Sequence, residues 1–250
     1  MPLRRGIPLR AVAPNAVTAL ALCSGLTGVR FAIAGEWERA AGAIIIAGVL
    51  DGLDGRIARL LKGQSKFGEQ LDSLSDVIAF GVAPALIMFL WSLKDVPRYG
   101  WIFALALAVC MAMRLARFNS QIDSVEQPHK SAGFLTGVPA PAAAGLAMLP
   151  LYIWLWSGQD MARIPWITAP WLAFVAFLAV SNIATFSWSS LRIRRSVRLE
   201  ALVGVALVGA ALLSAPFETL TVICLVYLGL IAWSVRSYAK VKRRRAAQAG

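Results

Sequence analysis

The sequence predicts an all-helical protein that crosses a membrane several times; its composition, its long apolar runs and the placement of its charges each support this class. Of the 250 residues, 58% are hydrophobic and only 15% are charged, whereas soluble domains carry about 25% charged residues. The mean hydropathy is +0.67. This composition excludes a water-soluble globular enzyme and a disordered chain. The formal charge of +12 does not indicate a nucleic-acid partner, because long uncharged runs separate the basic residues.

Eight stretches are apolar and long enough to be predicted as membrane-spanning helices. A helix needs about 20 mostly apolar residues to cross the roughly 30 Å hydrocarbon layer. In chain order the predicted spans are 13–34, 38–60, 71–93, 99–117, 133–156, 166–188, 199–215 and 217–238. A tight turn at Ser214, Ala215 and Pro216 is predicted between the last two spans, because proline ends one helix and can begin the next.

The Lys and Arg residues predict the orientation of these spans, since short loops rich in these residues stay in the cytoplasm. With both termini placed inside, most of the 25 basic residues fall in inner segments. The outer side then holds only Arg30, Arg39, Lys94, Arg98 and Arg163. This bias predicts an even number of spans, with both termini in the cytoplasm.

Four aspartates near the inner ends of the second and third predicted spans are the candidate functional residues. Asp51 and Asp54 are three residues apart and Asp72 and Asp76 are four apart, so each pair shares one helix face. The short polar connection 60–67 makes the two helices antiparallel neighbours. The four carboxylates can therefore converge between these helices, and ionisable groups in spanning helices indicate function.

Divalent cations would relieve the repulsion among carboxylates that lie so close together. Oxygen ligands with no Cys or His beside them favour Mg²⁺, Mn²⁺ or Ca²⁺ over zinc. Small residues lie among the aspartates and leave space for a ligand: Gly52, Gly55, Ala58 and Gly68. Arg59 follows Gly55 by one helical turn, where it can meet an anion. Metals, an arginine and small residues together predict a bound diphosphate. Paired aspartates are also common on solvated helix faces, but that reading does not explain the whole set in a chain with 13 acidic residues.

These residues form the pattern D-x-x-D-G-x-x-A-R, eight residues, G-x-x-x-D-x-x-x-D, which resembles the signature of the CDP-alcohol phosphotransferases. The matching positions are Asp51, Asp54, Gly55, Ala58, Arg59, Gly68, Asp72 and Asp76. The resemblance implies an integral-membrane, all-helical and usually dimeric protein, with a six-helix core to which this chain adds two C-terminal helices. The expected single domain, 1–250, divides into an interfacial segment 1–12, a catalytic core 13–188, two added helices 199–238 and a basic cytoplasmic tail 239–250.

The resemblance also implies roles for individual residues. Asp51, Asp54 and Asp72 would hold a pair of divalent ions with help from Asp76, which would be the general base. Gly55 and Ala58 would leave room for the cytidine nucleotide, while Arg59 would contact its phosphates. An N-terminal P-N-x-x-T element is matched at Pro14, Asn15 and Thr18. The complete set expected to bind the CDP-linked lipid is Asn15, Thr18, Asp51, Asp54, Gly55, Ala58, Arg59 and Gly68.

Two later segments resemble bacterial phosphatidylserine synthases, a branch of this family. Arg114, Arg117, Phe118 and Asn119 match R-x-A-R-F-N, and residues 134–145 approximately match F-x-G-x-P-x-P-A-A-A-G. This similarity implies CDP-diacylglycerol as the donor and L-serine as the acceptor. Since the serine carboxylate needs a cation and polar partners, the candidate acceptor-binding residues are Arg114, Arg117, Asn119 and Lys130. The positive-inside rule alone would also place basic residues here.

The resemblance further implies a homodimer. Compact loops and the absence of organelle targeting are typical of a bacterial inner membrane, and the distribution of Lys and Arg predicts an active site that faces the cytoplasm. Two alternatives stay open. The first is the same chemistry with a glycerol 3-phosphate or inositol-type acceptor, which would need two or more cations aimed at a phosphate. The second is a cation-coupled carrier that uses intramembrane carboxylates. Acids at helix ends beside Gly and Arg, without an inverted repeat, disfavour a carrier. Release of CMP would discriminate, because a carrier makes none.

Overall fold

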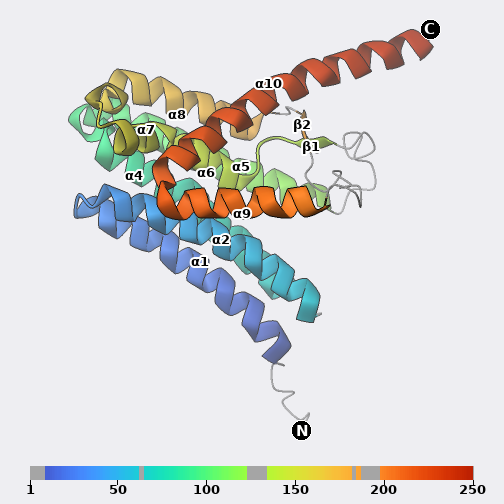
Figure 1. The fold of residues 1–250 in the computed structure, drawn as a ribbon, viewed down its shortest axis with the longest axis horizontal. Coiled ribbons are helices and arrows are strands. Elements are labelled where there is room, and N and C mark those ends of the chain that lie inside the picture. The colour runs from blue at the N-terminus through green and yellow to red at the C-terminus, as the bar shows by residue number, and fades with distance from the viewer. Residues whose placement is uncertain (1–8, 62–64, 123–133, 182–183, 187–197, 250) are drawn as a thin grey trace.

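The structure is a computed structural model that describes residues 9–61, 65–122, 134–181, 184–186 and 198–249, and it is a bundle of helices with one small sheet (Figure 1). The elements are α1 (Leu9–Ile33), α2 (Trp37–Leu61), α3 (Lys66–Asp76), the π-helical segment η1 (Val77–Val82), α4 (Ala83–Trp91), η2 (Leu93–Asp95), α5 (Pro97–Ile122), β1 (Phe134–Thr136), α6 (Ala140–Ala147), α7 (Leu149–Ser157), η4 (Asp160–Arg163), α8 (Pro165–Val180), β2 (Ala184–Phe186), α9 (Arg198–Ser214) and α10 (Pro216–Ala249).

Helices α1 and α2 form a close antiparallel hairpin along one side of the bundle (Figure 1). Gly35 turns the chain between them with a φ of 76°, a left-handed conformation that glycine adopts without strain. A Cβ at Gly28 would lie only 3.2 Å from the Ala40 carbonyl oxygen. Small residues therefore let the two helices approach closely, as is common for helix pairs in membranes.

The third predicted span, 71–93, is observed as a continuous helical path from Lys66 to Trp91, 26 residues long. It begins earlier than predicted because Ser65 caps it, its side chain accepting a hydrogen bond from the Gly68 N–H. Directly after Asp76 the path becomes π-helical (η1), and such segments are frequent near functional sites. A Cβ at Gly25 would lie 2.8 Å from the Ala79 Cα, so α1 crosses this segment at very close range.

The described residues bear out a polytopic membrane protein. Four helical stretches are long and apolar enough to cross a bilayer: Val12–Ile33, Lys66–Trp91, Arg98–Ser120 and Pro216–Ser234. Helices α6 and α7, bent by 46° at their junction, supply a fifth if they act as one broken span. The predicted turn at Ala215 between α9 and α10 is confirmed. Eight spans and cytoplasmic termini stay predictions.

The predicted all-helical class is confirmed, with one local departure: two short segments form strands. Residues 134–136 (β1) and 184–186 (β2) pair antiparallel, with Phe134 opposite Phe186. Predicted span 133–156 therefore starts as a strand, and span 166–188 leaves its helix after Val180. Gly137 has a φ of 80°, and this left-handed turn separates β1 from the helix that follows. Helix α10 also continues through most of the predicted tail, to Ala249.

A polar network lies at the end of the helical path α3–η1–α4 that is opposite to the aspartates. We call this group the far end; it consists of Trp91, Ser92, Arg163 and Thr168. The Ser92 hydroxyl lies 2.7 Å from the Arg163 carbonyl oxygen and 3.0 Å from Thr168 Oγ1. Arg163 Nε donates to the Trp91 carbonyl oxygen at 3.0 Å. Ser92 and Thr168 are both buried, so this network joins α4, η4 and α8 in a dry environment.

Candidate active site

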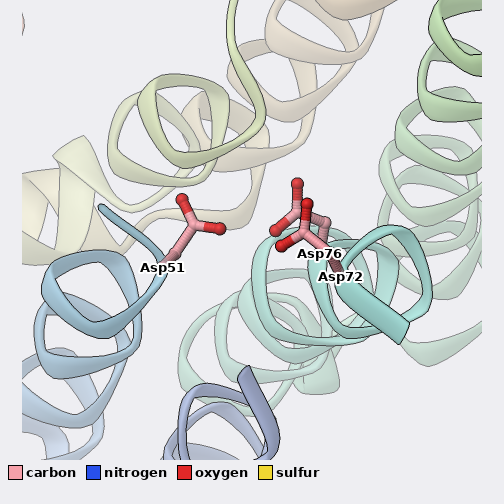
Figure 2. Close-up of side chains that lie close together, drawn as sticks. All are labelled: Asp51, Asp72 and Asp76. Carbon is pink, nitrogen blue, oxygen red and sulfur yellow. The ribbon is translucent and has the colours of Figure 1, made fainter. Parts of the chain in front are cut away.

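Three of the four predicted aspartates meet between α2 and α3. Asp51 extends from α2 toward Asp72 and Asp76, which extend from α3 (Figure 2). One carboxylate oxygen from each residue lies within 4.8 Å of the other two. We call these three residues the carboxylate cluster. They are half-buried rather than exposed, so water screens their mutual repulsion less than it would at an open surface.

Asp54 does not join this cluster but is held beside it. Its Oδ2 accepts a hydrogen bond of 2.7 Å from Thr18 Oγ1 of α1. The exposed fractions of Asp54 and Thr18 are only 6% and 4%. The charge of Asp54 still acts on Asp72, so Asp54 forms the flank of the cluster.

The cluster suits a hard divalent cation. It offers several carboxylate oxygens at close range, and these are the donors that Mg²⁺, Mn²⁺ and Ca²⁺ prefer. Among the described residues, no His or Cys belongs to the group, which disfavours zinc. A bound cation would also offset the repulsion of three like charges. The donor set therefore fits the predicted metal, with Asp51, Asp72 and Asp76 as candidate ligands and Asp54 beside them.

Helix α3 is tied to its neighbours by two serines that lie between Asp72 and Asp76 in the chain. Ser73 Oγ accepts a hydrogen bond of 2.9 Å from Asn119 Nδ2 of α5. Ser75, buried, donates to the Thr18 carbonyl oxygen of α1 at 3.2 Å. Neither serine was predicted from the sequence to be part of the site. Their signal was available, since they are polar residues inside an otherwise apolar predicted span.

The small residues of the signature leave space in two different ways. A Cβ at Gly52 or Gly55 would meet no other atom within 4 Å, so open space adjoins both positions. A Cβ at Gly68, in contrast, would lie 2.8 Å from Asn15 Oδ1. Gly68 thus lets the Asn15 side chain approach the start of α3, which brings the N-terminal element to the signature.

Arg59 and Ala58 follow on the same helix, α2. Ala58 is half-buried. Arg59 is exposed, and its Nε donates to the Gly55 carbonyl oxygen at 3.0 Å, one turn back on α2. Its contact with a nucleotide phosphate therefore stays a prediction.

Of the residues predicted to bind the acceptor substrate, Arg114 of α5 has the side chain best placed to bind a ligand. It is half-buried, and its Nε has no hydrogen-bond partner among the described residues. Asp76 and Tyr227 are charged or ionisable groups close enough to interact with its guanidinium. A buried N–H group without a partner is rare in folded proteins. Tyr227, on α10, was not predicted from the sequence and brings a C-terminal helix to this side of the site.

The other predicted acceptor residues differ from Arg114. The Arg117 guanidinium donates to the Val180 carbonyl oxygen, at the end of α8. Asn119 donates to Ser73, as described above. Lys130 lies outside the described residues. The structure thus brings Arg114 to Asp76 and gives Arg117 and Asn119 contacts within the protein.

Comparison with known proteins agrees with the signature. Residues 11–181 match the sequence profile of a family described as CDP-alcohol phosphatidyltransferase. Residues 197–231 match a second profile, CDP-alcohol phosphatidyltransferase 2. This second match spans α9 and the first part of α10, including Tyr227, and so lies in the two helices that were expected to be additions to the core.

Two relatives match over most of the chain. The chain is 36% identical over 234 residues to a CDP-diacylglycerol–serine O-phosphatidyltransferase of Mycobacterium tuberculosis, an alignment that covers 94% of this chain and 81% of the relative. It is 32% identical over 227 residues to the protein of the same name in Helicobacter pylori, covering 88% of this chain and 90% of the relative. These matches confirm the resemblance seen in the signature. The chain belongs to the CDP-alcohol phosphatidyltransferase family.

Proposed function

We propose that this protein transfers a phosphatidyl group from CDP-diacylglycerol to the hydroxyl of L-serine, giving phosphatidylserine and CMP. The observation that carries the proposal is the carboxylate cluster, in which Asp51 meets Asp72 and Asp76 from the other half of the signature. The relatives described above, whose names state this serine transferase activity, support the choice of donor and acceptor.

Asp51, Asp54 and Asp72, helped by Asp76, would hold the divalent ions, two Mg²⁺ or Mn²⁺ in this proposal. When bound, such ions polarise phosphoryl oxygens and offset the charge of the departing CMP. The protein's part is to keep four carboxylates near one point. Asp51, Asp72 and Asp76 have oxygens within 4.8 Å of one another, and the bond from Thr18 fixes Asp54 beside them.

Asp76 would act as the general base. It would accept the proton of the serine hydroxyl as that oxygen attacks the phosphorus distal to cytidine. A new P–O bond forms to serine while the P–O bond to CMP breaks, and CMP leaves. Asp76 suits this role because it belongs to the carboxylate cluster and its charge also interacts with the Arg114 guanidinium, so it would be near both the metals and the proposed acceptor site.

The CDP-linked lipid would lie over the open faces of Gly52 and Gly55 on α2, where a Cβ would meet nothing. Ala58 would contact the nucleotide, and Arg59 would swing from its present bond with Gly55 to the phosphates. Asn15, beside Gly68, would border the same space at the start of α3. Thr18 reaches this region through Asp54.

The acceptor would bind on the α5 side. Arg114 has a buried N–H to offer to a carboxylate, and a charge-assisted hydrogen bond of this kind is stronger than a neutral one. Arg117, Asn119 and Lys130 complete the proposed acceptor set. Arg117 would also bind the serine carboxylate, and the Asn119 bond to Ser73 would hold the α5 side in shape around serine.

We also propose the finer organisation predicted from the sequence. Residues 13–188 would form the catalytic core, residues 199–238 would be added helices, and the chain would cross a bacterial inner membrane eight times as a homodimer. The site would face the cytoplasm, because the outer loops carry few of the 25 basic residues.

An acceptor screen with the purified full-length protein tests the proposal. CMP release from CDP-diacylglycerol is measured in Mg²⁺ or Mn²⁺ with serine, glycerol 3-phosphate, inositol, inositol phosphate or choline. We expect serine to stimulate release most strongly, and chelation of the metal to abolish it. If glycerol 3-phosphate or an inositol compound stimulates CMP release and serine does not, that compound is the acceptor and the assignment of serine is wrong. No release under any condition, with cation uptake into proteoliposomes, would point to a carrier.

A further inference from the structure

Among the described residues, Thr18 alone makes hydrogen bonds to both halves of the signature. Its hydroxyl lies 2.7 Å from Asp54 Oδ2 on α2. Its carbonyl oxygen accepts a hydrogen bond of 3.2 Å from Ser75 Oγ on α3. Ser75 directly precedes Asp76 in the chain, so the path from Asp54 to the general base runs through one residue of α1.

Three residues of this path, Thr18, Asp54 and Ser75, are shielded from water. The exposed fractions are 4% for Thr18, 6% for Asp54 and 3% for Ser75. A hydrogen bond to a carboxylate is stronger in such surroundings than in water, because the local dielectric constant is low. Water cannot readily replace the Thr18 hydroxyl at this depth, so its removal would leave the Asp54 oxygen unpaired.

The side chain of threonine suits this position. Its Oγ1 is 3.2 Å from the Pro14 carbonyl oxygen, four residues earlier. Threonine in a helix often adopts the rotamer that allows this contact. The same hydroxyl then points to Asp54. Helix α1 packs along α2 and also along α3, so a fixed Thr18 rotamer relates the two helices that carry the aspartates.

From this geometry we infer that Thr18 is a positioning residue: it fixes Asp54 of α2 relative to Asp72 and Asp76 of α3 and thereby shapes the divalent-cation site. The inference rests on the metal-binding role in the proposed function. It differs from the role expected from the sequence, in which Thr18 contacts the CDP-linked lipid.

Binding of Mn²⁺ to the purified full-length protein, measured by electron paramagnetic resonance in the absence of both substrates, tests this inference. In Thr18→Val the shape of the side chain is kept and the hydroxyl is lost. We expect its Kd for Mn²⁺ to rise about 10- to 100-fold, the usual effect of removing a group that orients a metal ligand. Thr18→Ser keeps the hydroxyl, and we expect it to restore most of the affinity.

A buried threonine at the far end supplies a matched control. Thr168 is also fully buried and bonded to neighbouring polar groups. We expect Thr168→Val to lower the thermal stability while its Kd for Mn²⁺ stays at the wild-type value.

Each contrary result has its own meaning. Wild-type affinity in Thr18→Val, or equal damage in Thr18→Ser and Thr18→Val, would overturn the role of Thr18 and leave the proposed activity standing. An absence of Mn²⁺ binding by the wild-type protein would overturn both the metal site and this inference. The CMP assay of the wild-type protein tests the proposed transfer separately, since it needs no Thr18 variant.

Discussion

The two ends of the α3–η1–α4 path carry buried polar groups of opposite kinds. At the far end, Ser92 and Thr168 bond to each other and to main-chain carbonyls, and the Arg163 side chain donates to the chain at Trp91. At the other end, three carboxylates face one another at close range. The Ser92, Thr168 and Arg163 side chains of the first group meet acceptors, although the buried Trp91 Nε1 has no partner among the described residues. The second group holds acceptors of like charge.

This difference indicates what each end contributes. A satisfied network stabilises the packed helices, since a buried polar group without its partner would cost about 1–3 kcal/mol. A cluster of like charges destabilises the empty protein and is retained where a ligand compensates it. Changes at the far end should therefore affect stability alone, and changes at the carboxylate cluster should affect activity and metal binding first.

The largest effect is expected from Asp76→Asn. The amide keeps the size of the side chain but cannot accept the serine proton, so turnover should fall at least about 100-fold, the scale of a lost general base. Binding of CDP-diacylglycerol in the presence of metal should persist. CMP formation and equilibrium lipid binding measure the two properties separately. Normal turnover of this variant would remove Asp76 from the role of base.

Arg117→Ala should have a smaller and more selective effect. If Arg117 binds the acceptor carboxylate, loss of a charge-assisted hydrogen bond should raise the KM for serine about tenfold. The affinity for CDP-diacylglycerol should stay the same. Initial rates with each substrate varied in turn give both constants. Equal loss for both substrates would instead assign Arg117 to its structural bond with the Val180 carbonyl.

The sequence predicted the cluster correctly in outline, and the difference at Asp54 comes from helix geometry together with a partner on another helix. Residues four apart on an α-helix are separated by about 40° around its axis, whereas residues three apart are separated by about 60°. Asp72 and Asp76 accordingly both enter the cluster. Asp54 is turned from Asp51 and meets Thr18 instead. Spacing alone could not predict this choice, because the Thr18 partner comes from another helix.

The parts of the fold that the sequence did not predict depend on contacts between distant segments. β1 and β2 each have three residues, and each is completed only by the other strand. The break between α6 and α7 likewise lies inside one apolar stretch, where hydrophobicity gives no boundary. The four long apolar helices were predictable, since length and apolar composition within one segment determine them.

Asp51→Asn should separate stability from metal binding at the cluster. Removal of one of three like charges relieves repulsion in the metal-free protein, so its unfolding temperature in a chelator should rise by about 2–4 °C, as expected for about 1 kcal/mol in a chain of this size. The further stabilisation that Mn²⁺ gives the wild-type protein should shrink, because a ligand is lost. Thermal unfolding with and without Mn²⁺ measures both effects. A metal-free variant less stable than the wild type would contradict repulsion within the cluster.

The smallest effect is expected at the opposite end, from Ser92→Ala. The hydroxyl has two neighbours there, the Arg163 carbonyl at 2.7 Å and Thr168 Oγ1 at 3.0 Å, and its loss should lower the free energy of unfolding by about 1 kcal/mol. The kcat, both KM values and the Kd for Mn²⁺ should stay at wild-type values, because no part of this network touches the carboxylates. Chemical denaturation measures the free energy of unfolding, and steady-state kinetics on the same preparation measure kcat and KM. A changed Mn²⁺ affinity in Ser92→Ala would show that the two ends are coupled through the α3–η1–α4 path, and the division between a stabilising end and a reactive end would then fail.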